Sequence, residues 1–517
     1  MAATQPPLTP SPQQLWARLR PDWLTGYGVG EAFPEENRDS QINQQWIANV
    51  NHRRHQLQQH ESDRHQPQKR PLLLIAEPDP LNFLASFWAA LLSDWDIALA
   101  NSDWGGREWH SALQILQPTL TWPPPNPRSL SVVVDASPAR RVGQTQPIIT
   151  TRGLSVVEGQ TQPSILIPTG GTTGTLKFAQ HTWATLYAAA ISFCQTFPTP
   201  IHTYCVLPVY HVSGLMQILR AWFSQAQVII TPFKTLETSP PLISSPANWY
   251  ISLVPTQLTR LIAAHKGPWL SQFQAVLLGG APPWPTLLTQ ATHQNIPLCL
   301  SYGMTETAAM VTVQTPGTQN HSSGTPLPHV KITIEAAGLP QPADTVGQIV
   351  IQAPTVALGY CGVNSTAFSA QKFRTDDLGY LTAQGQLYVT GRTSSKIISG
   401  GENIFPAEVE AALRSTDQVK DVHVFSQPDP QWGEAVTAAF VPAHPKVTSR
   451  SLQAALSAGN AAPLLSRYKH PKHWIALSHI PRNAQGKLLK SALTTQIAQL
   501  SNSSNNPAAD SDADCPS

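Results

Sequence analysis

A segment rich in glycine and hydroxyl residues, about one third of the way along the chain, has the composition of an anion-binding loop. It reads TGGTTGTLK over residues 169–177 and follows the apolar run Ile165 to Ile167. Glycines let backbone N–H groups turn toward an anion, threonine hydroxyls donate further hydrogen bonds, and a lysine adds a mobile positive charge. The Gly-Lys-Ser/Thr ending of a Walker P-loop is absent. The segment therefore predicts a polyphosphate site, with an ordinary flexible turn as the alternative.

Short apolar segments that alternate with amphipathic ones must position this loop. Residues 71–75 predict a buried strand, and the next segment predicts a helix whose apolar face carries Leu84, Phe87, Trp88, Leu91 and Leu92. Further short apolar runs, several of them followed by plausible helices, occur at residues 132–134, 165–167, 205–207, 228–230, 251–253 and 275–278. Such alternation is typical of the α/β class, in which parallel sheets are covered by helices.

The pattern changes twice after this region. Residues 325–389 contain short alternating strands, separated by Gly, Pro and Asp, at residues 331–335, 347–352 and 386–389. They predict a β-rich subdomain. Beyond Gly391, helices at residues 406–414 and 451–457 and strands near Val422 and at residues 436–441 predict a compact α+β unit. We expect a domain boundary at residues 391–395.

The two ends of the chain differ from the rest in composition. Residues 1–70 form a divergent N-terminal segment, in which residues 36–70 are rich in Gln, His, Asn and Arg and predict either a solvated helix or a loop. Residues 501–517 contain no large apolar side chain, so they cannot offset the entropy lost on ordering. We expect that tail to be disordered, leaving a large domain at residues 71–390 and a small one at residues 391–500.

Composition restricts the classes of function. A chain of 517 residues predicts two or more domains. Charged residues make up only 12%, and the net charge is +2 without a long basic run. The basic surface expected of a nucleic-acid-binding protein is therefore missing, and neither nucleic acid nor an anionic membrane is an expected partner.

The sequence also predicts a protein that stays where it is made. Its apolar segments are interrupted by Glu77, Asp79 and Asp94 well short of the roughly 18 residues that a membrane-spanning helix needs. The first 14 residues lack the basic start and apolar core of a signal peptide. Five widely spaced cysteines, an odd number, indicate free thiols in a reducing compartment, so we expect a cytoplasmic location.

Five blocks in a fixed order resemble the signatures of the adenylate-forming superfamily, which includes acyl-CoA synthetases, peptide-synthetase adenylation domains and luciferases. The blocks are residues 165–177, SYGMTET at 301–307, RTDDLG at 374–379, the glycine-rich block at 391–408, and PRNAQGK at 481–487. The resemblance implies a large N-terminal domain of helix-covered sheets with a β-rich subdomain, followed by a small mobile α+β domain. The segment before residue 70 resembles no known family.

The resemblance also implies which residues bind ATP. The β- and γ-phosphates would be held by Thr169, Gly170, Gly171, Thr172, Thr173, Gly174 and Lys177. Tyr302 would offer adenine a flat face, Thr305 would place a hydroxyl near the α-phosphate, and Gly280 would line the nucleotide site. Glu306 supplies the hard oxygen ligand that suits Mg²⁺. The alternative for Tyr302 is a place in the core.

The ribose and the reacting groups have candidates in the later blocks. Asp377 would accept both ribose hydroxyls with Arg392 nearby, although the adjacent Asp376 stands where the family often has Gly. Lys487 is the main catalytic candidate, because adenylation builds negative charge where a preorganised cation acts most strongly. The turn containing Gly400 and Gly401 would line the approach of coenzyme A. The family's hinge usually has Asp where this chain has Ser395.

A narrower resemblance, to the o-succinylbenzoate-CoA ligases of menaquinone and phylloquinone biosynthesis, suggests the acyl substrate. It rests on residues 207–214, 252–258, 277–282 and 324–328 and on Arg220. His211 would gate the acyl pocket and take part in catalysis. The substrate has two carboxylates, and Arg220 is the natural partner of the one that does not react. The pocket would be completed by Ser252, Gly279 and Thr325. The alternatives are a structural His211 and an Arg220 on the helix surface.

These features predict an ATP-dependent acid-thiol ligase. It would convert o-succinylbenzoate, ATP and coenzyme A into o-succinylbenzoyl-CoA, AMP and pyrophosphate through an acyl-AMP, with Mg²⁺ as cofactor. The alternatives are another aryl- or acyl-CoA ligase, a stand-alone adenylation enzyme that loads a carrier protein or acts as an oxygenase, and an inactive binding protein.

Overall fold

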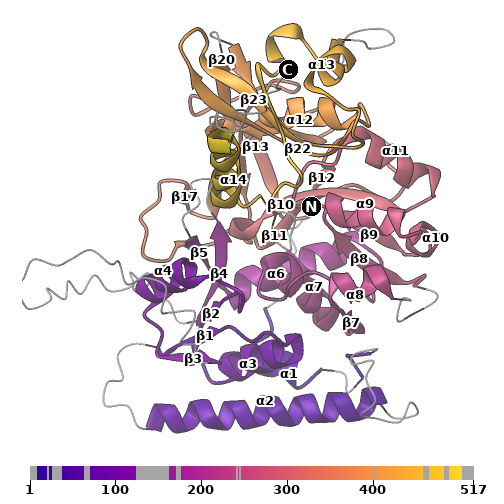
Figure 1. Cartoon of the computed structure of the whole chain (residues 1–517). Coiled ribbons are helices and arrows are strands. Elements are labelled where there is room, and N and C mark those ends of the chain that lie inside the picture. Colours follow the sequence, from indigo (N-terminus) through magenta and orange to yellow (C-terminus); the bar gives the residue numbers. More distant parts are fainter. Residues whose placement is uncertain are drawn as a thin grey trace, which may run out of the picture. The chain divides into compact units, whose positions relative to one another are not determined.

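The computed structural model of the chain forms two compact units (Figure 1). One consists of residues 1–283 and 287–390, and the other of residues 284–286 and 391–517. Within these ranges the structure describes residues 9–19, 22–25, 38–62, 70–123, 162–170, 176–239, 243, 246–318, 320–399, 402–457, 465–482 and 488–503. None of the helices in those ranges combines the length and the apolar character needed to cross a membrane.

The first sheet of the large unit carries the predicted phosphate loop. Its six strands, in spatial order, are β16 (Gly359–Tyr360), β5 (Leu176–Thr182), β4 (Ser164–Gly170), β2 (Asp96–Leu99), β1 (Leu72–Ile75) and β3 (Leu120–Trp122). The strands from β4 to β3 are parallel, whereas β5 and β16 are antiparallel to their neighbours. Helices cover both faces. Leu73 packs in one core with α3 (Pro80–Leu92), and Leu74 packs in another with α4 (Gly106–Leu116).

The second sheet has seven strands. In order they are β12 (Thr325–Pro326), β11 (Ala309–Val313), β10 (Leu298–Met304), β9 (Ala275–Leu278), β8 (Trp249–Leu253), β6 (His202–Cys205) and β7 (Val228–Ile230). The five strands from β10 to β7 are parallel, and β11 and β12 are antiparallel. The expected helix-covered parallel sheets are thus confirmed, with antiparallel strands added at one edge of each. The helices of this region are α6 (Trp183–Thr196), α7 (Val212–Phe223), α8 (Phe233–Thr238), α9 (Pro255–Ala263), α10 (Gly267–Leu270) and α11 (Pro285–His293).

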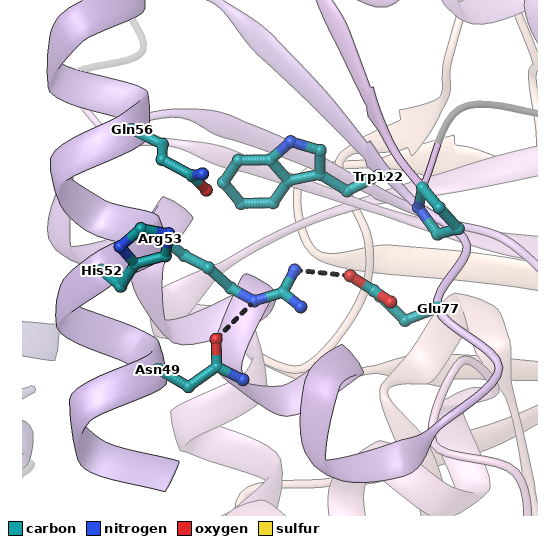
Figure 2. A pocket seen from close by; sticks show the side chains of 7 residues that line it. Asn49, His52, Arg53, Gln56, Glu77 and Trp122 are labelled. Atoms are coloured by element: carbon teal, nitrogen blue, oxygen red, sulfur yellow. Dashed lines mark hydrogen bonds and ion pairs between the residues drawn. The ribbon is translucent and has the colours of Figure 1, made fainter. Parts of the chain in front are cut away.

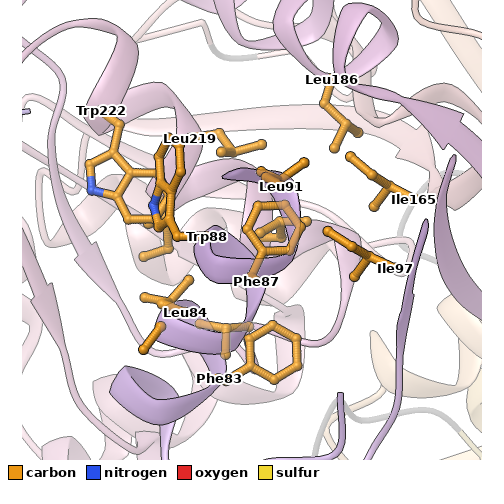
Figure 3. Packing of buried hydrophobic residues seen from close by; sticks show 14 of the residues in the cluster. Phe83, Leu84, Phe87, Trp88, Leu91, Ile97, Ile165, Leu186, Leu219 and Trp222 are labelled. Atoms are coloured by element: carbon orange, nitrogen blue, oxygen red, sulfur yellow. The ribbon is translucent and has the colours of Figure 1, made fainter. Parts of the chain in front are cut away.

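A cluster of tryptophans forms the centre of the largest core. Trp88 of α3 lies 5.0 Å from Trp222 of α7, and Trp23 lies 4.8 Å from Trp46, measured between ring centroids. Figure 3 shows Trp88 and Trp222 side by side among apolar side chains of helices and of strands β2 and β4. The indole N–H groups of Trp23, Trp88 and Trp222 have no hydrogen-bond partner among the described residues. At these three rings, apolar burial and ring packing therefore stabilise the core.

Residues 38–62, for which the sequence left a solvated helix or a loop open, form α2 (Arg38–Ser62), and the helix is not merely solvated. It buries Asn43, Trp46, Val50 and Leu57, at spacings of three, four and seven residues. The Asn43 amide accepts from the Leu24 N–H and donates to the Leu24 carbonyl. One stripe of a largely polar helix is thus part of the core, with α1 (Pro12–Trp16) packed nearby on α3.

An ion pair fastens α2 to the first sheet. Arg53 reaches across a polar hollow of about 260 Å³, and its Nη1 lies 2.5 Å from Oε1 of Glu77, which follows β1 (Figure 2). The Arg53 Nε donates to Asn49, and its guanidinium lies 5.4 Å from the ring centroid of Trp122 at the end of β3. Glu77 neutralises the guanidinium, and Asn49 accepts a hydrogen bond from it. The charged residues of this hollow therefore serve to hold α2 on the first sheet.

The β-rich region that the sequence predicts is a third, antiparallel sheet. Its strands are β14 (Leu339–Pro340), β13 (Lys331–Ala336), β15 (Gly347–Gln352), β18 (Lys372–Leu381) and β17 (Phe368–Ser369), with β19 (Leu387–Arg392) paired to β18. The smaller unit contains β20 (Ile397–Ser399), β21 (Glu402–Ile404), β22 (Val419–Asp429), β23 (Gly433–Pro442) and β24 (His473–Ala476), with α12 (Pro406–Arg414), α13 (Ser449–Ser457) and α14 (Lys490–Ser503). The α+β character expected of that unit is confirmed.

Two expectations fall wholly or partly outside the described residues. The strand predicted at residues 132–134 lies there, as does the tail from residue 504 onward. Residues 501–503, which we expected to be disordered, are the last turn of α14. Four of the five cysteines are described, and all four are free thiols, as expected.

The packing of α2 can be tested with Trp46. Its side chain is 2% exposed, and its indole N–H donates to the Leu81 carbonyl at 3.0 Å. We expect Trp46→Ala to lower the free energy of unfolding by about 3–5 kcal/mol, because it leaves a large cavity. The exposed Gln45→Ala on the same helix should change it by less than about 0.5 kcal/mol. Urea unfolding followed by circular dichroism measures both, and equal effects would contradict the assigned packing.

Candidate active site

The predicted phosphate loop is the turn of a hairpin. Strands β4 and β5 pair so that Thr169 lies opposite Lys177 and Gly170 lies opposite Leu176. Both ends of the loop are therefore fixed by strand pairing. Gly171, Thr172, Thr173 and Gly174 lie outside the described residues. The Lys177 ammonium lies 4.9 Å from the ring centroid of Tyr360, on the neighbouring strand β16.

A tight turn after β10 places Thr305 and Glu306. The chain leaves β10 through the short 3₁₀ helix η2 (Thr305–Thr307) and returns as β11 through positive φ values at Ala308 and Ala309. A side chain at Gly303 would meet the backbone, because a Cβ there would lie 1.8 Å from the Ala309 carbonyl oxygen. Glycine at this position therefore permits the close approach of the two strands.

Glu306 is a buried carboxylate that has no counter-charge among the described residues. Its residue is 8% exposed, and it forms no ion pair with any described residue. The Tyr360 hydroxyl donates to Oε1 at 2.8 Å. Burial, and then the neighbouring Glu306 carboxylate, raise the pKa of Tyr360 far above its ordinary value, so this hydroxyl stays protonated. A buried anion left in this state is costly unless a cation joins it.

The donor set suits Mg²⁺ that arrives with a nucleotide. No group of three or more His, Cys, Asp and Glu side chains that could hold a metal occurs in the described part of the chain. Mg²⁺ rarely needs such a cage, because it keeps several waters and is held by one or two carboxylates together with substrate phosphates. One buried carboxylate near Lys177 and the hairpin loop fits that mode of binding.

His181 holds the same turn, and the sequence interpretation missed it. Its Nε2 donates to the Thr305 carbonyl at 2.7 Å, and its Nδ1 lies 3.0 Å from the Thr185 hydroxyl. Burial lowers the pKa of His181 to about 4, only partly offset by the bond to Thr305. The imidazole is therefore neutral at physiological pH. A strand period of two places His181 on the same face as Lys177, which is the sequence signal that could have revealed it.

Tyr302 and Asp377, the candidates for adenine and ribose, lie together. The Tyr302 hydroxyl donates to Oδ2 of Asp377 at 2.7 Å. Asp377 is 5% exposed and its N–H donates to the Thr375 hydroxyl, whereas Asp376 lies on the other face of β18. This alternation favours Asp377 over Asp376 as the residue that faces a ligand. Arg392 belongs to the smaller unit, and Lys487, Gly400 and Gly401 lie outside the described residues.

The candidate pocket residues of the second sheet gather near the carboxyl ends of its parallel strands, where ligands bind in open α/β sheets. His211 immediately precedes α7, and its ring lies 4.8 Å from that of Tyr210. Gly279 and Gly280 follow β9, and a Cβ on Gly279 would lie 2.8 Å from the Ser301 hydroxyl. Ser252 lies in β8.

Arg220 and Thr325 are placed differently. Arg220 lies nine residues after His211 on α7, about 13 Å along the helix axis. It is 4% exposed, so the alternative of a helix-surface arginine is wrong. Its guanidinium lies 4.1 Å from the ring centroid of Phe193, its Nε has no described partner, and burial lowers its pKa to about 10. Thr325 is exposed in β12, where it lines a hollow of about 250 Å³ with Phe197.

Comparison with known proteins gives two family matches. The model of the AMP-binding enzyme family matches residues 113–361, and that of the AMP-binding enzyme C-terminal domain matches residues 408–487. The 2-succinylbenzoate–CoA ligase of Bacillus velezensis is 34% identical over 337 residues, which are 63% of this chain and 68% of the relative. The ligase of the same name from Listeria monocytogenes is 32% identical over 337 residues, which are likewise 63% and 68%.

Solved structures show the same similarity. The o-succinylbenzoate CoA synthetase of Bacillus subtilis in complex with its acyl-adenylate intermediate has a TM-score of 0.70 and 26% identity, covering 87% of this chain and 92% of that chain. The same enzyme in complex with AMP gives a TM-score of 0.70 at 25% identity. MatB from Rhodopseudomonas palustris, at 20% identity and a TM-score of 0.69, shares the fold.

The buried imidazole of His181 predicts a pH dependence of stability. The unfolded chain binds a proton at this residue below about pH 6.5, whereas the folded chain resists it down to about pH 4. Stability is therefore lost as the pH falls through this window, by about 3 kcal/mol in all. The variant His181→Gln removes the titrating group, so its unfolding free energy should fall less between pH 7 and 4.5. Parallel pH curves for wild type and variant in urea unfolding would contradict the assignment.

Proposed function

Because the chain belongs to the AMP-binding enzyme family, we propose that it is a ligase that joins 2-succinylbenzoate to coenzyme A with ATP. The reaction releases AMP and pyrophosphate. The observation that carries the proposal is the set of linked contacts among Lys177, Tyr360 and Glu306, which lies beside a hairpin loop of phosphate-binding composition. The relatives named 2-succinylbenzoate–CoA ligase, at 32–34% identity, support this choice of acid.

The first half-reaction makes the acyl-adenylate. A carboxylate oxygen of the acid attacks the α-phosphorus of ATP, and the bond to pyrophosphate breaks. Thr169, Lys177 and the hairpin loop would hold the β- and γ-phosphates, and the Thr305 hydroxyl would face the α-phosphate. Glu306 would hold Mg²⁺, which neutralises charge on the phosphates when bound. Tyr302 supports adenine, with Gly280 alongside, and Asp377 binds the ribose hydroxyls.

The second half-reaction forms the thioester. The sulfur of coenzyme A attacks the acyl carbonyl carbon, and the bond between that carbon and the AMP oxygen breaks. Lys487 acts in the first step, Gly400 and Gly401 line the coenzyme A path in the second, and Arg392 assists at the ribose. A swing of the smaller unit about residues near Ser395 would exchange these groups. We also propose a cytoplasmic location, because the free thiols of the described cysteines suit a reducing compartment.

The acid itself would lie between the carboxyl ends of the second sheet and α7. Its succinyl carboxylate reacts beside His211, near Gly279 and Ser252. The ring carboxylate is then farther from the reaction centre and needs a buried cation. Arg220 supplies this cation from α7, the helix that follows His211. The Nε of Arg220, which has no partner among the described residues, supports this role, because a buried donor without a partner is rare in native proteins. Thr325 is the candidate for a neutral contact to the ring.

A pair of acids that differ by one carboxylate tests both the substrate and Arg220. The wild type should use 2-succinylbenzoate at least about 30-fold better in kcat/KM than 3-benzoylpropionate, which lacks the ring carboxylate, since a buried charge pair is worth roughly 2 kcal/mol or more. Arg220→Ala should abolish most of that preference and leave ATP binding unchanged. The measurement is AMP and thioester formation for both acids, with coumarate and a fatty acid as controls.

Three results would contradict these assignments. A wild type that forms thioester with coumarate or the fatty acid but not with 2-succinylbenzoate would identify another acyl-CoA ligase. An acyl-AMP that never passes to coenzyme A would identify an adenylation enzyme of another class. If Arg220→Ala keeps the full preference for the diacid, then Arg220 is structural and packs against Phe193.

A further inference from the structure

We propose that Tyr360 is a positioning residue that fixes the Glu306 carboxylate for Mg²⁺ and the Lys177 ammonium for the phosphates. The inference rests on the proposed function and deepens it, because it names a residue that holds two binding groups of the same site. Tyr360 itself touches no reacting atom in this account. It acts only through its contacts with Glu306 and Lys177.

The backbone around Tyr360 is attached to both groups that it would position. On one side the strand β16 pairs with β5, where Tyr360 lies opposite Ala179, two residues from Lys177. The N–H groups of Leu358 and Cys361 also donate to carbonyls of β5, at 2.8 and 2.9 Å. On the other side the N–H of Ala357 donates to the backbone carbonyl of Glu306 at 2.9 Å. The segment around Tyr360 therefore connects β5 with the backbone of Glu306.

The direction of the Tyr360 ring is also set. Phe368 packs edge-to-face against it, with 5.0 Å between the centroids and 88° between the planes. The ammonium of Lys177 lies over the face of the ring, and the hydroxyl points to Oε1 of Glu306. One aromatic side chain is thus held by its neighbours so that its face meets a cation and its hydroxyl meets a carboxylate.

Tyr360, Glu306 and Lys177 have different chemical roles in this arrangement. The Tyr360 hydroxyl donates to Oε1 of Glu306, so Tyr360 binds the carboxylate and leaves the metal to Glu306. With Oε1 held, the second oxygen of Glu306 has a fixed direction in which to meet a cation. Partners that orient a metal ligand in this way typically change metal affinity by about 10–100-fold when they are removed. The ring face attracts the Lys177 ammonium through its quadrupole.

The variant Tyr360→Phe separates the two contacts, because it keeps the ring and removes the hydroxyl. We expect the Mg²⁺ concentration that half-saturates ATP binding to rise about 10-fold, with the rate of acyl-AMP formation recovered at high Mg²⁺. Tyr360→Leu also removes the ring, so ATP affinity should fall further and should not recover at high Mg²⁺. Calorimetry of ATP binding at stepped Mg²⁺ concentrations measures this without any turnover.

Tyr250→Phe is the matched control. The Tyr250 hydroxyl donates to the Pro198 carbonyl at 2.9 Å, and burial raises its pKa to about 12, but it lies on β8 and has no contact with Glu306. Its loss should lower the melting temperature and leave the Mg²⁺ dependence unchanged. A Tyr360→Phe variant with the wild-type Mg²⁺ midpoint would overturn the proposal, whatever its melting temperature.

The outcomes also distinguish this inference from the proposed function. If the wild type binds Mg²⁺ and ATP but forms no adenylate with 2-succinylbenzoate, the proposed substrate fails, and the comparison of Mg²⁺ midpoints still tests Tyr360. If the adenylate forms normally and Tyr360→Phe does not shift the midpoint, only the positioning role fails.

Discussion

The carboxylate of Glu306 is buried without a counter-charge among the described residues, and this constraint organises the rest of the site. An isolated anion in a protein interior is unfavourable, so its position must be enforced by the structure around it until a cation arrives. Three hydrogen bonds fix its position. The Tyr360 hydroxyl donates to the carboxylate, the Ala357 N–H donates to the backbone carbonyl of Glu306, and His181 donates to the carbonyl of the preceding Thr305. A carboxylate held in this way is what we expect of a residue that binds a metal-bound polyphosphate.

The fold explains how residues far apart in sequence reach that carboxylate. The strand β5 carries both Lys177 and His181, and its antiparallel pairing with β4 fixes the two ends of the phosphate loop. The strand β10 brings Glu306 from the second sheet, so the site joins the two sheets of the large unit. The tryptophan core under α2, α3 and α7 stabilises the helices that cover those sheets. Apolar burial therefore supplies the stability that the polar site lacks.

The sequence predicts the regular elements well where local pattern decides. Strand β15 and helix α12 have the predicted bounds, residues 347–352 and 406–414, because their apolar periodicity is clear. The burial of α2 was not predictable, since one stripe of apolar residues is hidden among Gln, His and Asn. The sequence does not reveal the roles of Tyr360 and His181, because their side chains form hydrogen bonds with residues 54 and 124 positions away. The sequence names Arg220 as a candidate, but its contact with Phe193 depends on the packing of α6 on α7. The domain division, the residue roles and the mobility of the smaller unit stay predictions.

The central claim, that the Glu306 carboxylate is the protein's ligand for the metal of bound ATP, is tested most directly by calorimetry of ATP binding with and without Mg²⁺. The wild type should bind ATP at least about 10-fold more tightly with Mg²⁺, because the cation relieves the repulsion between the buried carboxylate and the phosphates. Glu306→Gln should bind metal-free ATP at least as tightly as the wild type, since the repulsion is gone, and should gain little from Mg²⁺. An undiminished gain from Mg²⁺ in Glu306→Gln would contradict the account.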